Sequence, residues 1–192
     1  PDEQINEFIR FFGKHIGSDR IYIFEDCDEK HVTKNTYEWC ADGIVPEIHE
    51  LQNVDMDIIG WWYQAFGSEK NIIITDIEQI KDEHRESYNM LKAQNVKNLV
   101  VCPIRYKDEI KGFFGLDNPP ESDTLGLTTF LDMIGTLLIS LLKLRNSFTK
   151  SNKEAKLSSY SSLSSIYISM AVVNVQTHRY HIVKTLDEVV HF

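Results

Sequence analysis

The chain has 192 residues, of which 42% are apolar and 26% are charged, and this composition excludes an intrinsically disordered protein. Its nine glycines and five prolines show no period, and three cysteines cannot all pair, so collagen-like and disulfide-stapled classes are excluded too. The formal net charge of -9 makes nucleic acid and an anionic membrane surface poor partners.

The N-terminal third predicts a helix followed by a β-hairpin. Apolar residues recur at helical spacing over residues 3–16, and Gly17 is a typical helix stop. Segments 21–25 and 31–40 alternate in side-chain type on either side of a polar turn, which is typical of paired strands. The helical stripe consists of Ile5, Phe8, Ile9, Phe12 and Ile16.

The middle of the chain predicts short elements joined by loops. A two-turn helix is expected to end at Gly67, and residues 71–75 form a short apolar strand. Asp76 is placed to cap the helical segment that follows, and Asn95 is placed to end a helix over 84–94.

The strongest strand signal comes next. Residues 98–106 and 110–118 predict a second hairpin, which Pro119 and Pro120 end. A long helix is expected from Thr124.

This long helix carries an apolar stripe at alternating spacings of four and three, which is the pattern of a helix that pairs with another. We therefore predict a homodimer through this helix. A second apolar face, with Phe130, Leu137 and Leu144, leaves one face for the sheet and one for the partner. The predicted dimer interface consists of Leu127, Leu131, Ile134, Leu138 and Leu141.

Composition predicts three parts of the chain. Residues 1–148 form one domain, and the serine-rich residues 149–165 are expected to be a linker. Residues 166–192 read as one hairpin, which is too little for an independent domain, and are interpreted as the start of a second domain.

Cysteine usage predicts a cytoplasmic location, because an odd number of cysteines without a secretory signal is best interpreted as free thiols. Residues 125–144 come closest to a membrane span, but they contain Asp132 and Lys143. We therefore expect no membrane span in this chain.

No catalytic or metal-binding motif is evident, so we predict neither an enzyme nor a metal site. In the predicted hairpin Cys27 and Cys40 lie about 30 Å apart, too far for a disulfide. Cys102 lies in an apolar strand and is interpreted as a small core residue.

Aromatic residues are the remaining functional signal. Core packing is the simplest interpretation, because each buried ring stabilises a fold by itself. Their crowding beside the irregular segments 43–70 and 76–96 nevertheless favours a cavity roofed by loops on one sheet face. We predict that the rings form the walls of a small-molecule site and that a carboxylate orients the ligand. The predicted ligand-binding residues are Tyr37, Trp39, Trp62, Phe66 and Asp117.

Over residues 3–148 the sequence resembles a GAF domain, with DRIYIFE, TYEWCADGI, WWYQAF, NIIITD and the closing hairpin from Asn95 to Pro119 in the family's order. The resemblance implies an α+β fold, with the first and last helices on one face of a central antiparallel sheet and a ligand pocket on the other. It is similar in particular to GAF domains that precede diguanylate cyclase or histidine kinase modules in bacterial signalling proteins, and residues from 166 resemble the opening of a PAS-like domain.

The resemblance implies a sensory domain without catalytic activity, and it leaves the cofactor unknown. The motif of cyclic-nucleotide-binding GAF domains is not reproduced at residues 114–117, and no cysteine is followed by histidine, as bilin-binding GAF domains require. Two alternatives stay open. One is a purely structural dimerisation module, and the other is an enzyme like the GAF-fold reductases of free methionine sulfoxide, which use three pocket cysteines.

Overall fold

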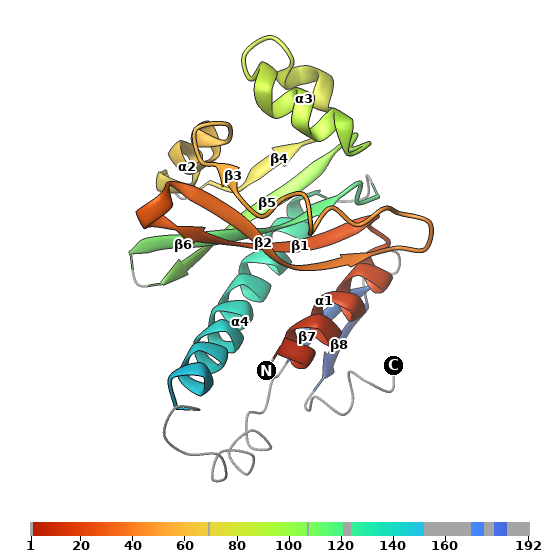
Figure 1. The fold of residues 1–192 in the computed structure, drawn as a ribbon. Coiled ribbons are helices and arrows are strands. Elements are labelled where there is room, and N and C mark those ends of the chain that lie inside the picture. Colours follow the sequence, from red (N-terminus) through yellow and green to blue (C-terminus); the bar gives the residue numbers. More distant parts are fainter. Residues whose placement is uncertain are drawn as a thin grey trace.

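A computed structural model of the protein describes residues 2–68, 70–106, 108–120, 124–151, 170–174 and 179–183. Its centre is a six-stranded antiparallel sheet with the strand order β3-β2-β1-β6-β5-β4 (Figure 1). Both predicted hairpins are confirmed, and they lie side by side because β1 pairs with β6. The strands are β1 Arg20–Cys27, β2 Val32–Cys40, β3 Val54–Asp55, β4 Ile72–Ile74, β5 Leu99–Tyr106 and β6 Glu109–Asp117.

The helices lie on both sides of this sheet. The first and last helices, α1 (Asp2–Ile16) and α4 (Thr124–Ser151), lie on one side, and α2 (Gly60–Gly67) and α3 (Arg85–Ala93) lie on the other (Figure 1). This confirms the predicted α+β layout. Two 3₁₀ turns, Asp28–Lys30 and Ile77–Ile80, complete the element order of this part of the chain.

The predicted helix cap and helix stop in the middle of the chain are confirmed. The Asp76 carboxylate accepts a hydrogen bond from the Glu78 backbone N–H at 2.9 Å and so caps the turn that follows. Asn95 has a φ of 59°, the left-handed conformation that commonly ends a helix.

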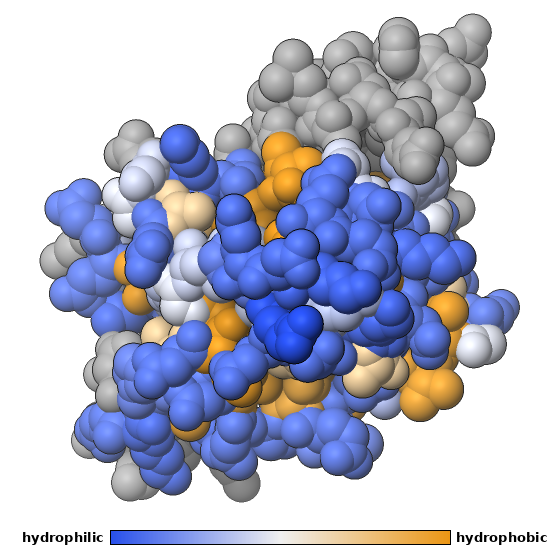
Figure 2. Space-filling view, turned by 90° about the horizontal axis from the view of Figure 1, so that it is seen from above, coloured by the Kyte–Doolittle hydropathy of each residue, from blue (hydrophilic) through white to orange (hydrophobic). Residues whose placement is uncertain are grey.

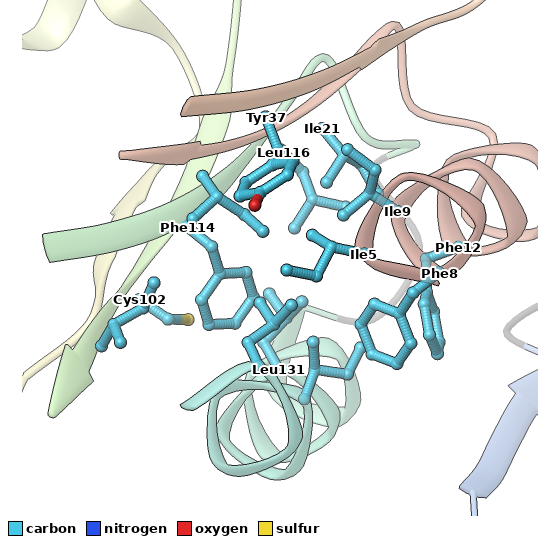
Figure 3. Close-up of a cluster of buried hydrophobic side chains, with 14 of the residues drawn as sticks. Ile5, Phe8, Ile9, Phe12, Ile21, Tyr37, Cys102, Phe114, Leu116 and Leu131 are labelled. Atoms are coloured by element: carbon cyan, nitrogen blue, oxygen red, sulfur yellow. The ribbon is translucent and has the colours of Figure 1, made fainter. Parts of the chain in front are cut away.

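The two faces of the sheet pack two separate cores, because side chains alternate along each strand. On β1, Ile21 and Ile23 point to the α1 and α4 side, whereas Tyr22 and Phe24 point to the α2 and α3 side. The helix-side core is shown in Figure 3, where Tyr37, Phe114 and Leu116 from the sheet meet side chains of α1 and α4.

The structure corrects the predicted dimer stripe. Leu131, Ile134, Leu138 and Leu141 are buried within the protomer, in the core between α4, α1 and the sheet. They are therefore not available to a partner in this structure. The side chain of Leu127 lies outside the described residues. On the second apolar face, Leu137 and Leu144 are half-buried.

The C-terminal half of α4 is tied to the sheet by charged and polar contacts. Arg145 makes a bidentate ion pair with Glu25 of β1, with distances of 2.7 and 2.6 Å, and donates to the Tyr37 hydroxyl of β2 at 3.0 Å. The Tyr37 hydroxyl in turn hydrogen-bonds to Asp2 at the start of α1. One cluster therefore joins both terminal helices to the first hairpin.

Beyond Ser151, the described residues form one antiparallel hairpin of β7 (Met170–Asn174) and β8 (Arg179–Val183). Most of the predicted linker, and the rest of the predicted second domain, lie outside the described residues. In the part of the chain that the structure describes, none of the helices has the length and hydropathy needed to cross a bilayer.

Candidate ligand pocket

A recess lies on the sheet face that carries α2 and α3, and its cavity volume is about 30 Å³. That is room for about two water molecules, so an organic ligand enters only if the roof side chains move apart. That face of the molecule is mostly hydrophilic, with hydrophobic side chains showing in patches between hydrophilic ones (Figure 2). The sheet supplies the floor through Arg20, Tyr22, Phe24, Glu38, Phe113 and Asp117.

The roof comes from elements far apart in the sequence. The irregular segment before α2 contributes aliphatic side chains, α2 contributes an indole ring, and α3 contributes both apolar and amide groups. This confirms that the recess is covered by the segments whose aromatic content stood out in the sequence. The roof includes Leu51, Val54, Ile59, Trp62, Leu91 and Gln94.

An ion pair forms the polar end of the floor. Arg20 begins β1, Asp117 ends β6, and the two residues are direct partners in the β1–β6 register. The Arg20 Nη1 donates to Asp117 Oδ2 at 2.8 Å, and the Arg20 Nη2 donates to the Val45 carbonyl at 2.9 Å. The Arg20 and Asp117 side chains are 4% and 2% exposed, so the pair is shielded from water.

A second carboxylate, Glu38, lies beside this pair, with its Oε1 3.6 Å from Arg20 Nε. Its Oε2 accepts hydrogen bonds from the backbone N–H groups of Glu47 and Ile48, at 2.9 and 3.0 Å. Its Oε1 accepts from the Asn35 side chain at 3.1 Å. Both Glu38 oxygens therefore have hydrogen-bond partners within the protein.

Asp117 differs from Glu38, because its second oxygen, Oδ1, is buried and accepts no hydrogen bond. Burial raises the pKa of Asp117 to about 6, and Arg20 opposes this rise. Burial, together with the nearby Asp117 carboxylate, also raises the pKa of Tyr22 well above its ordinary value, so Tyr22 is a neutral phenol.

The other end of the recess is aromatic. The rings of Phe24 and Phe113 are stacked, with centroids 4.8 Å apart and an angle of 12° between their planes. Trp62 meets Phe113 edge to face at 5.5 Å and is 2% exposed. The Trp62 indole N–H is buried without an acceptor, whereas the neighbouring Trp61 indole donates to the Ser87 hydroxyl at 3.0 Å.

Of the five predicted ligand-binding residues, the structure brings Trp62 and Asp117 together in the recess. The predictions for Tyr37 and Trp39 were wrong. Both side chains are on the helix side of the sheet, because they share the alternation phase of β2 that points to α1. Phe66 is fully buried in the core below α2 but does not line the recess.

Arg20, Tyr22 and Phe24 were not predicted as recess residues, and Phe113 was given no predicted pocket role. A signal existed for Phe113, since it lies four residues before Asp117 on the same strand and therefore on the same sheet face. No comparable signal existed for Arg20, which meets Asp117 only through the pairing of strands 97 residues apart.

The three cysteines, all of them described residues, form no disulfide and do not converge on the recess, since no cysteine is among the described residues that line it. Cys102 is in the helix-side core, as predicted for a small buried residue (Figure 3). Burial raises the pKa of the Cys40 thiol to about 11. A reactive cysteine requires a lowered thiol pKa, so Cys40 does not support the reductase alternative.

Among the described residues, one cluster has metal-ligand chemistry, His31 with Asp55 and Asp57. All three are exposed, and His31 Nε2 lies 2.9 Å from Asp57 Oδ1. The hydrogen bond to Asp57 raises the pKa of His31. The group lies outside the recess and is explained by this exposed ion pair.

Comparison with solved structures assigns the fold. The phycocyanobilin-bound GAF domain of a cyanobacterial phytochrome superposes with a TM-score of 0.61 over 78% of this chain and 86% of that chain, at 18% identity. The fold is that of a GAF domain. The GAF domain of Thermosynechococcus elongatus PixJ, in its blue-light absorbing form, gives a TM-score of 0.54 over 81% of this chain and 97% of that chain, at 16% identity.

The sequence matches no family model. A curated relative of this GAF-fold chain is the methanogenesis regulatory histidine kinase FilI of Methanothrix harundinacea (strain 6Ac), which is 23% identical over 121 residues. The match covers 61% of this chain and 13% of that kinase, so the chain spans a small part of the relative's length.

Proposed function

We propose that this chain is a non-catalytic sensory GAF domain of a cytoplasmic signalling protein, in which a small molecule binds in the recess and controls an output domain. The single observation that carries the proposal is a set of three buried polar atoms without hydrogen-bond partners, on residues that line the recess: Asp117 Oδ1, Arg20 Nε and Trp62 Nε1. A buried polar atom without a hydrogen bond costs about 1–3 kcal/mol, and a ligand that satisfies such atoms removes that cost.

Strand β1 both lines the recess and contacts the exit helix α4. Tyr22 and Phe24 of β1 line the recess, and the next residue, Glu25, makes the ion pair with Arg145 of α4. A ligand that shifts this part of β1 therefore acts on the exit helix through one residue. An unequal affinity of the ligand for two positions of α4 is what control of an output domain requires.

Homodimerisation is part of the proposal, but through a different surface from the one predicted. Leu144 of α4 is half-buried and is a candidate for such a contact, together with the exposed part of Leu137, which also packs against the helix-side core. Similarity to a regulatory histidine kinase favours a kinase or a related module, such as a diguanylate cyclase, as the output, with a PAS-like domain beginning near residue 166.

A small-fragment library tested by thermal unfolding checks whether the recess binds ligands. Binding at a hundred times the Kd stabilises the folded state by about 2.7 kcal/mol, which raises the Tm by roughly 5–10 °C in a chain of this size. We expect Leu51→Trp, which fills the recess from its half-buried rim, to abolish these shifts.

The matched control is Trp39→Phe on the opposite sheet face, which should retain every shift of the unmodified protein. Fragments whose shifts persist in Leu51→Trp bind elsewhere. A library without a single hit sensitive to Leu51→Trp would contradict the proposed sensory function.

A further inference from the structure

The charges in the recess do not balance. Among the described residues that line it, the ionisable groups are one cation, Arg20, and two carboxylates, Glu38 and Asp117, while Tyr22 is a phenol. The lining contributed by residues 51–59, α2 and α3 adds no titratable group. The lining therefore carries one negative charge in excess.

The cation is already engaged by the protein on two of its three nitrogens. Arg20 donates through Nη1 to Asp117 and through Nη2 to the Val45 carbonyl, while its buried Nε makes no hydrogen bond and lies 3.6 Å from Glu38 Oε1. An anion that entered the recess would meet two carboxylates and only one guanidinium. Moving such an ion out of water without a charge partner is strongly unfavourable.

The acceptor that remains is the Oδ1 of Asp117. The Tyr22 hydroxyl interacts with the Asp117 carboxylate and lowers the pKa of Asp117, but Oδ1 has no hydrogen-bond partner at normal distance and angle. Since Glu38 has partners on both oxygens, the charge in excess is concentrated at this one atom. Its natural complement is an N–H donor that carries a positive charge.

When the roof side chains move apart, the rest of the recess suits the remainder of such a ligand. Phe24, Phe113 and Trp62 supply aromatic surface for an apolar body, and ring faces attract a cation. The free indole N–H of Trp62 requires an acceptor, such as a hydroxyl or carbonyl oxygen.

On the basis of the proposed sensory function, we propose that the recess selects a small organic amine in its protonated form. Its ammonium group donates to Asp117 Oδ1, its apolar body lies against Phe24, Phe113 and Trp62, and an oxygen of the ligand accepts from Trp62 Nε1. Anionic ligands, including nucleotides, are excluded by the same charges.

The test uses matched ligands that differ in one group. Hydroxyphenylethyl, indolylethyl and cyclohexylmethyl bodies, each carrying an ammonium, hydroxyl or carboxylate group, are titrated calorimetrically against the full chain at pH 7.5, and the phenolic hydroxyl of the first body supplies the acceptor for Trp62 Nε1. We expect at least one amine to bind about tenfold or more tightly than its alcohol, which is the range for a charge-assisted hydrogen bond, and the carboxylates to bind weakest.

Asp117→Asn is expected to reduce this preference for the amine to near unity, whereas Asp42→Asn, which makes the same charge change on the exposed loop after β2, leaves it intact. Should Asp117→Asn not fold, pH supplies the second measurement in the unmodified protein. Amine affinity should fall as the pH drops through about 6, where Asp117 takes up a proton while the amine stays charged.

Two other outcomes would contradict the amine proposal, and they differ in what they imply for the sensory function. Alcohols or carboxylates that bind as tightly as the amines, together with fragment hits sensitive to Leu51→Trp, would overturn the amine proposal and leave the sensory function standing. The absence of any ligand sensitive to Leu51→Trp would remove both.

Discussion

Replacing Arg20 by methionine is expected to destabilise the fold by about 3–5 kcal/mol, because the substitution leaves the buried Asp117 carboxylate without its charge partner. Methionine keeps much of the apolar volume of arginine, so the loss reports on charge rather than on a cavity. Urea unfolding at pH 8 measures the loss as a change in the free energy of unfolding.

The loss is expected to depend on pH. Without Arg20, the folded-state pKa of Asp117 should rise beyond the present value of about 6. Between pH 6 and that higher value, the folded variant then binds more protons than the folded unmodified protein. The deficit in the free energy of unfolding therefore narrows as the pH falls from 8 toward 6.

Arg10→Met is the matched control, because Arg10 forms an exposed ion pair with Glu7 within one helix. Such exposed pairs contribute little, so we expect almost no change in the free energy of unfolding and no pH dependence between pH 6 and 8. Equal losses for Arg20→Met and Arg10→Met would contradict the importance of the buried pair.

Replacing Leu138 by aspartate is expected to prevent folding at room temperature. Leu138 is 1% exposed and lies in the core between α4, α1 and the sheet. Truncation of a buried leucine alone costs about 2–5 kcal/mol, and a buried unpaired carboxylate adds to that cost. The total is comparable to the whole stability of a typical domain.

Leu144→Asp tests the other face of the same helix. Leu144 is half-buried, so the variant should fold, with a loss of about 1 kcal/mol or less. Circular dichroism and sedimentation distinguish the two variants. A folded but monomeric Leu138→Asp would restore the originally predicted dimer interface, and a monomeric Leu144→Asp from a dimeric parent would support the second face.

The sequence predicted the elements well because their signals are local. The stripe of α1, the capping aspartate at Asp76 and the left-handed Asn95 are each visible within a few residues, and all are confirmed. The arrangement of α4 was less predictable. A four-three apolar spacing is the same whether a helix packs on another helix or on its own sheet, so the burial of Leu138 needed the tertiary structure.

In the pocket, too, the residues with local sequence signals were predicted and those that depend on strand pairing were not. Aromatic crowding correctly indicated a recess below α2 and identified Trp62, and the end of β6 identified Asp117. Residue type does not reveal which face of a strand a ring occupies, so Tyr37 was assigned to the wrong side. Arg20 could not be found, because its role depends on the pairing of β1 with β6.

The most direct test of the account follows the three tryptophan indole N–H groups by NMR during titration with 2-(4-hydroxyphenyl)ethylamine, which carries both an ammonium group and a hydroxyl. Trp62 lies in the recess with a free N–H, Trp61 donates to Ser87, and Trp39 lies on the opposite sheet face. Trp62→Phe assigns the key signal by removing it. The account predicts that the Trp62 signal shifts in a saturable manner while the Trp39 signal stays in place; an unmoved Trp62 signal would contradict it.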